Sequence, residues 1–88
     1  MIKGKTKTGF AYEIKDEVMD DMELVEALAR TTTDPSAIID ALERILGADQ
    51  KKALYEHARQ KDGHVSIAAC EAELEEILAN AGEDAKKS

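Results

Sequence analysis

Hydrophobic positions recur at helical spacing through most of the chain, and residues 34–47, DPSAIIDALERILG, show the pattern best. Asp34 can cap a first turn, Pro35 suits the first helical position, and Gly47 can take the left-handed conformation that ends a helix. The apolar side chains between them follow at steps of three and four residues and share one face: Ile38, Ile39, Leu42, Ile45 and Leu46. The other segments are expected to pack around this helix.

Another helix is predicted at residues 21–30, after a short first turn at 16–19. Asp16, Asp20 or Asp21 can cap it, and acidic residues favour the positive end of the helix dipole. Its expected apolar side consists of Met22, Val25, Leu28 and Ala29, with Leu24 beside them and Glu23 and Glu26 opposite. Three threonines follow at 31–33 and are expected to form the connection, because β-branched residues lose rotamer freedom in a helix.

Two more helices are predicted after Gly47. Asp49 can cap the first, Asp62 and Gly63 can end it, and the short link before Asp49 predicts a sharp turn. Its apolar stripe is thin and consists of Ala53, Leu54, Tyr55 and Ala58. Ser66 can cap the last helix, and Gly82 is expected to end it. This helix has an apolar stripe of Ile67, Cys70, Leu74, Ile77, Leu78 and Ala81, and an acidic outer face of Glu71, Glu73, Glu75 and Glu76.

The N-terminal segment has the alternation of a strand rather than the period of a helix. Phe10, Tyr12 and Ile14 alternate with Ala11 and Glu13. Residues 2–7 can supply a partner strand and make a hairpin, or they can remain a frayed lysine-rich arm, and both alternatives stay open. An exposed strand edge here would be a candidate site of association by strand addition.

The pattern predicts a mainly α fold: a small four-helix domain preceded by a short N-terminal β-strand or hairpin. A chain of 88 residues is expected to form a single domain. Within it, residues 1–15 form the basic arm or β element, residues 16–82 the helical core, and residues 83–88 a flexible tail.

The net charge of −7 narrows the classes of partner. Such a charge repels phosphate backbones and anionic membranes, so neither nucleic acid nor a membrane is an expected partner. The charge can serve solubility, or it can attract a partner with a basic surface. The single Cys70 can form no internal disulfide, and no apolar run is long enough for a membrane span, so a cytoplasmic location is expected.

Residue types that carry chemistry are few and far apart. His57, His64 and Cys70 do not have the close pairwise spacing of zinc ligands, and structural roles are expected for all three. No calcium-loop spacing and no glycine-rich phosphate loop occurs in the sequence. We therefore predict no catalytic, metal-binding or cofactor-binding residue, and we interpret the chain as a protein-binding module rather than an enzyme.

Three blocks of the sequence carry a family resemblance: GFAYEIKDEVMDDMELVEALA, DPSAIIDALERILG and ILGADQKKALYEHARQKDGHVSIAACEAELEEIL. Over roughly residues 9–80 the chain resembles the small tail-assembly chaperones of long-tailed bacteriophages and prophages. The resemblance implies a largely helical protein of the bacterial host cell that binds the tape-measure protein and tail tube subunits during tail assembly. It also implies a longer form made by ribosomal frameshifting, and no catalytic residues.

The sequence also suggests where a partner would bind. Met19, Met22, Leu24 and Val25 are expected near an apolar groove, because methionine adapts to varied partners, although each taken singly is more often a core residue. Phe10 and Tyr12 on the predicted strand, and Glu71 and Glu75 on the last helix, complete the candidate set. Self-association stays open. The alternative function is a small acidic inhibitor or nucleic-acid mimic that occupies a basic site on a host protein.

Overall fold

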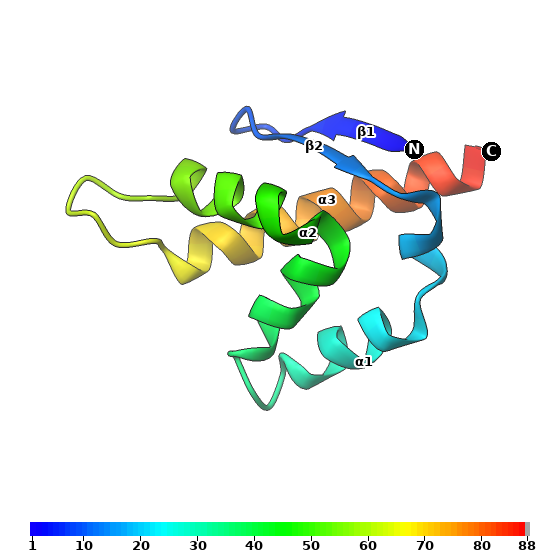
Figure 1. Ribbon diagram of the computed structural model, residues 1–88, viewed down its shortest axis with the longest axis horizontal. Coiled ribbons are helices and arrows are strands. Elements are labelled where there is room, and N and C mark those ends of the chain that lie inside the picture. The colour runs from blue at the N-terminus through cyan, green and yellow to red at the C-terminus, as the bar shows by residue number, and fades with distance from the viewer. Residues whose placement is uncertain (88) are drawn as a thin grey trace.

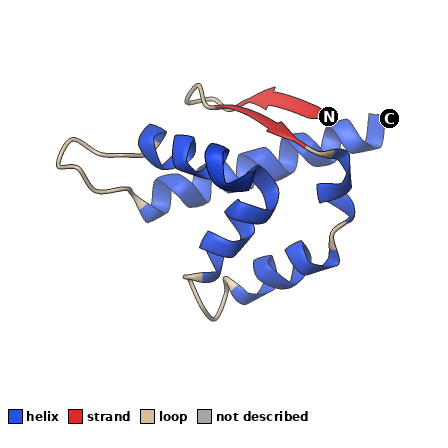
Figure 2. Cartoon of the chain, viewed as in Figure 1, coloured by secondary structure: helices blue, strands red, loops and turns tan. Residues whose placement is uncertain are grey.

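The computed structural model describes the backbone of residues 1–87 and the side chains of residues 1–83. It is mainly helical, as predicted, and begins with a two-stranded antiparallel hairpin (Figure 2). The hairpin lies against α3 and the second half of α2, while α1 lies at the opposite side of the molecule (Figure 1). The elements in chain order are β1 (Ile2–Lys5), β2 (Ala11–Ile14), the 3-10 helix η1 (Asp16–Asp20), α1 (Met22–Arg30), α2 (Ala37–His57) and α3 (Ile67–Lys87).

The prediction of four helices is wrong, because the described residues contain three α-helices. The two helices expected on either side of Gly47 are one element, α2, which bends at that residue. Gly47 has φ +80° and ψ 167°, a conformation that residues with a β-carbon rarely adopt. Gly47 itself is not helical, so the regular helix stops there, as expected, and the second half of α2 follows directly in a new direction (Figure 1).

The hairpin is held in register by the burial of one face. Tyr12 pairs with Gly4, and the close approach of the Tyr12 ring leaves no room there for a β-carbon. Phe10, Tyr12 and Ile14 are at most 5% exposed and belong to the same core as the helices. An isolated two-stranded sheet is marginally stable in water, so the hairpin depends on this contact with α2 and α3.

Helix α1 buries a side that only partly overlaps the predicted one. Leu24 and Ala27 are buried and Leu28 is half-buried, whereas Met22 and Val25 are 70% and 57% exposed. Both sides of this helix are apolar, so the periodicity alone could not identify the side that faces the core. The side that faces the core includes the small residue Ala27, which is fully buried.

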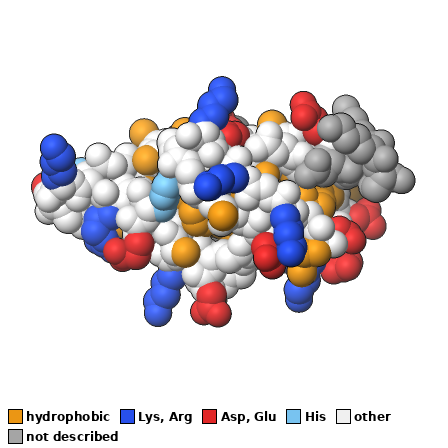
Figure 3. All heavy atoms as spheres, turned by 90° about the horizontal axis from the view of Figure 1, so that it is seen from above, with side chains coloured by type: hydrophobic (Ala, Val, Ile, Leu, Met, Phe, Trp, Pro, Cys, Tyr) orange, Lys and Arg blue, Asp and Glu red, His pale blue; other side chains and the backbone are white. Residues whose placement is uncertain are grey.

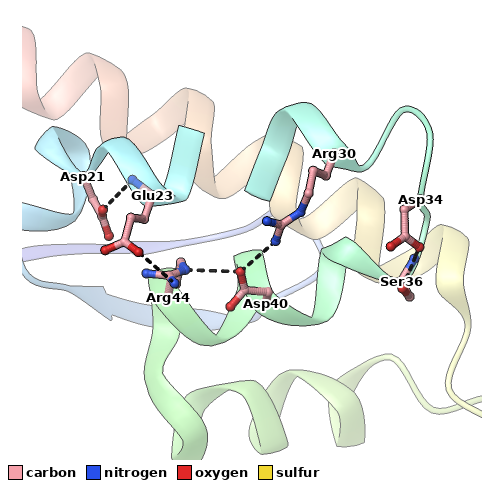
Figure 4. A network of polar contacts seen from close by, with 7 residues as sticks. All are labelled: Asp21, Glu23, Arg30, Asp34, Ser36, Asp40 and Arg44. Carbon is pink, nitrogen blue, oxygen red and sulfur yellow. Dashed lines mark hydrogen bonds and ion pairs between the residues drawn. The ribbon is translucent and has the colours of Figure 1, made fainter. Parts of the chain in front are cut away.

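Ion pairs along the same contact fix the position of α1 on α2 (Figure 4). Asp40 of α2 accepts hydrogen bonds from Arg30 at 3.1 Å and from Arg44 at 3.2 Å, and Arg44 lies 3.6 Å from a carboxylate oxygen of Glu23. Asp21 caps α1 by accepting a hydrogen bond from the amide of Glu23 at 2.9 Å. These groups are partly exposed to solvent, so they orient the two helices more than they stabilise them.

Several helix ends differ from the prediction. Asp34 bonds the hydroxyl and the amide of Ser36, which holds the pKa of Asp34 below its ordinary value, and α2 begins at Ala37 rather than at Pro35. The predicted cap by Ser66 is confirmed, since its hydroxyl oxygen accepts a hydrogen bond from the amide of Ala69.

The predicted ends at Gly63 and Gly82 are wrong. The second half of α2 ends at His57, and Gly63 lies in the loop that follows, with φ +98°. Helix α3 continues through Gly82 to Lys87. The expected flexibility of residues 83–88 falls mostly on side chains outside the described part and stays a prediction.

Gly47 at the bend of α2 and Gly82 within α3 give a matched test of the bend. Replacing Gly47 by Ala should lower the free energy of unfolding by about 1–3 kcal/mol, because a β-carbon is disfavoured at this φ and ψ. Gly82 lies inside regular helix with free space around it. Replacing Gly82 by Ala should therefore raise the free energy of unfolding by about 0.5–1 kcal/mol. Urea unfolding followed by circular dichroism measures both. Equal effects of the two substitutions would contradict a specific role for Gly47.

Candidate protein-binding groove

An open apolar groove of about 420 Å³ lies between the first half of α2 and the start of α3. Two large side chains on its walls, Ile39 and Ile67, are 49% and 67% exposed to solvent. We call this surface the apolar groove; it is lined by Pro35, Ser36, Ile38, Ile39, Leu42, Tyr55, Val65, Ser66, Ile67 and Cys70. Exposed apolar surface of this kind is typical of a binding site for another protein or an apolar ligand.

The bend in α2 is what brings the walls of the groove together. Ile39 and Leu42 come from the first half of α2, and Tyr55 comes from the second half. In a straight helix, positions this far apart in sequence would lie about 20 Å from one another along the axis. Because the helix changes direction at Gly47, the three side chains line one depression.

The loop at 58–66 supplies the third wall. It is a tight turn closed by a bridge between Arg59 and Val65 and by the amide of Gln60, which donates to the carbonyl of His64 at 2.8 Å. The guanidinium of Arg59 also donates to the carbonyl of Gly63 at 2.6 Å. These bonds place Val65 and the cap of α3 against the groove.

A second, smaller hollow of about 230 Å³ continues the apolar groove along α3. The two hollows share Pro35 and Ile38. The second hollow is lined by Leu28, Thr31, Thr32, Pro35, Ile38, Glu71, Leu74, Glu75 and Leu78, and we call it the acidic end of the groove. From Ile67 to Leu78 the combined depression follows α3 for about 16 Å, which is three turns of helix.

The eight candidate partner-binding residues fall in different environments. Glu71 and Glu75 line the acidic end of the groove. Phe10, Tyr12 and Leu24 are core residues, with exposures of 5%, 2% and 4%, and Met19 is half-buried. Met22 and Val25 are exposed on the outer side of α1 and line none of the hollows described above.

The groove predicted near Met19 and Met22 stays a prediction, and the apolar groove lies on other helices. The sequence prediction did not identify Ile39 and Ile67 as surface residues. Each lies at the margin of an apolar stripe, and the whole stripe was expected to be buried in the core. The width of those apolar stripes could have indicated that some of their residues are exposed. A stripe broader than the core can cover leaves its marginal residues exposed.

The acidic outer face predicted for α3 is smaller than expected. Glu73 is 5% exposed, and the carboxylate of Glu76 accepts a hydrogen bond from the amide of Lys7 at 2.8 Å. Glu71 and Glu75 remain on the surface, beside the groove. Two of the four predicted surface acids thus take part in holding the hairpin.

A polar cluster joins the hairpin to α2 and α3, through Thr8, His57 and Glu73. The hydroxyl of Thr8 donates to Glu73, and it lies 2.8 Å from Nε2 of His57. The same nitrogen, Nε2, lies 3.6 Å from the carboxylate of Glu73. A catalytic relay would need the hydroxyl and the carboxylate on different ring nitrogens. The cluster therefore has the geometry of a structural tie.

The remaining histidine pairs locally. His64 contacts Asp62 through both its amide and its ring, and these hydrogen bonds lower the pKa of Asp62.

Among the described residues, no group of three or more His, Cys, Asp or Glu side chains could hold a metal ion. Within the same residues no helix is both long and apolar enough to cross a membrane. Comparison of the chain with protein-family models, curated proteins and solved structures gives no match.

Cys70 provides a chemical probe of the groove. It is 5% exposed, and burial, together with the nearby carboxylate of Glu73, raises the pKa of its thiol. The raised pKa means less thiolate at a given pH, so alkylation by iodoacetamide near pH 8 should be at least about tenfold slower than in the urea-unfolded chain. The rate should increase as the pH rises toward the thiol pKa. An equal rate in folded and unfolded protein, measured by mass spectrometry, would contradict the burial of this thiol.

Proposed function

We propose that the protein is a non-enzymatic binding module that receives an amphipathic helix of a partner protein in the apolar groove. The observation that carries this proposal is the exposure of Ile39 and Ile67 on the walls of one continuous apolar depression. A depression about 16 Å long matches roughly three turns of a partner helix, whose apolar residues would recur at every third or fourth position.

Covering the exposed isoleucines of the groove would contribute favourable free energy to binding. Full burial of a large aliphatic side chain gains about 1.5–3 kcal/mol, so covering Ile39 and Ile67 would contribute at most about 3–6 kcal/mol. Both side chains are already half-covered or less, and the partner's own apolar residues would add a similar amount. Binding of a helix in this way would shield its apolar stripe from water and from other chains.

The acidic end of the groove supports a partner helix with basic residues. Glu71 and Glu75 are one helical turn apart on α3 and line the same hollow as Leu74 and Leu78. Lysine or arginine beside the apolar stripe of the partner would lie close to these carboxylates. Such pairs at the rim of an interface select the orientation of the partner more than they add affinity.

The sequence resemblance to tail-assembly chaperones supports a specific partner. In that reading the occupant is a helical segment of the tape-measure protein, and tail tube subunits are further partners, in the cytoplasm of the bacterial host cell. A long helical protein with unpaired apolar stripes aggregates unless the stripes are covered. The module would keep the tape-measure protein soluble until the tail is built.

Co-expression with a tape-measure fragment tests the proposal. The module should raise the soluble yield of the fragment, and Ile67→Glu and Ile39→Glu should weaken binding by at least about tenfold, because a buried charge replaces apolar contact. Met22→Glu is the matched control for Ile67→Glu, since the exposures of Met22 and Ile67 are 70% and 67% and Met22 gains the same charge outside the groove. It should bind as the unmodified protein does.

The same experiment separates the alternatives. Loss of binding in Met22→Glu with normal binding in Ile67→Glu would move the site to α1. A fragment whose solubility and pull-down do not change with the module would rule out the chaperone function. Calorimetric titration of the purified fragment gives the dissociation constants, and circular dichroism shows that each variant is folded.

A further inference from the structure

The outer edge of β2 is covered by a side chain from α2. The amide of Glu13 donates to Oε1 of Gln50 at 2.7 Å, and Nε2 of Gln50 donates to the carbonyl of Glu13 at 2.7 Å. The carboxamide of Gln50 thus forms both hydrogen bonds that a neighbouring strand would form. Gln50 is itself held by a hydrogen bond to the carbonyl of Leu46 at 2.8 Å.

The contact between Gln50 and Glu13 also shows which backbone groups of β1 point away from β2. Glu13 faces Lys3 in the register, and its amide and carbonyl point away from β1, so the two residues form a non-hydrogen-bonded pair. The pair of Lys5 and Ala11 is of the same kind, because it lies two residues farther along. The amides and carbonyls of Lys3 and Lys5 therefore point toward the outer edge of β1.

No described residue forms a hydrogen bond with these outward groups. In Figure 1 β1 is the outermost strand, and in Figure 3, which views the molecule from this side, lysine and arginine side chains project from the surface. The free edge ends before Lys7, whose amide is bound to Glu76. The side chains of Lys3 and Lys5 are exposed and stand on the same face of the strand.

We propose that the outer edge of β1 binds an extended, acidic segment of a partner protein by strand addition. The incoming strand would bond the amides and carbonyls of Lys3 and Lys5 and would place its acidic side chains opposite the two lysines. A second copy of this chain is a less favourable occupant than an acidic strand. Every antiparallel register that used these outward groups on both copies would set lysine against lysine, which is destabilising.

The site shares no residue with the apolar groove and requires a different partner chemistry, since the groove takes a helix and this edge takes a strand. If strand addition at β1 fails, the proposal of helix binding in the apolar groove is unaffected, and the reverse also holds.

The probe is an acetylated, amidated heptapeptide of alternating glutamate and valine, and its counterpart with lysine in place of glutamate is the control. Both are titrated into the full chain, with amide resonances observed by NMR.

With the glutamate peptide, the amides of Lys3 and Lys5 should shift, and their hydrogen exchange should slow about tenfold at ten times the dissociation constant, because free molecules alone exchange. The lysine peptide should cause neither effect. Lys3→Pro should abolish binding, since it removes an outward amide that no hairpin bond uses, whereas Lys3→Thr keeps the amide and should bind. The double change Lys3→Glu and Lys5→Glu should exchange the preferences, so that the lysine peptide binds.

Three results would overturn the proposal. The first is the absence of any change at Lys3 and Lys5 at millimolar glutamate peptide. The second is a double charge reversal that leaves the preference for the glutamate peptide unaltered. The third is protection of the same two amides without peptide, together with dimers in analytical ultracentrifugation, which would make a second copy the occupant.

Discussion

The backbone conformation at Gly47 determines which side chains of α2 can meet. With this residue at positive φ, the first half of α2 packs on α1 and the second half packs on the hairpin. The same bend places Ile39 and Tyr55 on one depression, so the core and the candidate binding surface depend on one local geometry. A groove made by two halves of one helix has walls fixed by the fold itself, which lowers the ordering cost when a partner binds.

The hairpin and the helices stabilise one another through groups far apart in sequence. Thr8 and Lys7, in the loop of the hairpin, bond Glu73 and Glu76 of α3. On the inner face, Phe10 packs beside the ring of His57 at a centroid distance of 5.6 Å. The small sheet therefore has a buried apolar face, anchored loop bonds and one covered edge, and these together compensate for its shortness.

The sequence predicted where the strands and helices lie along the chain better than it predicted which side of each helix is buried. Alternation around Tyr12 and the three-four spacing around Leu42 correctly predicted a strand and a helix, because these signals are local. The inner side of α1 could not be predicted, since Leu24 and Val25 are equally apolar and the choice depends on how closely α2 approaches. Glu73 was assigned to the surface because its partner, Thr8, is 65 residues away. Of the residues that line the two hollows, the sequence singled out Glu71 and Glu75 as candidates and left out the exposed isoleucines.

The anchoring of the hairpin to α3 has a consequence for the order of events during synthesis. The residues that form β1 and β2 leave the ribosome before the side chains that support them, Glu73 and Glu76, are made. Until then the strands have no stable place on the helices. The lysines of β1 would protect the nascent chain in this interval, because like charges keep neighbouring nascent strands from pairing.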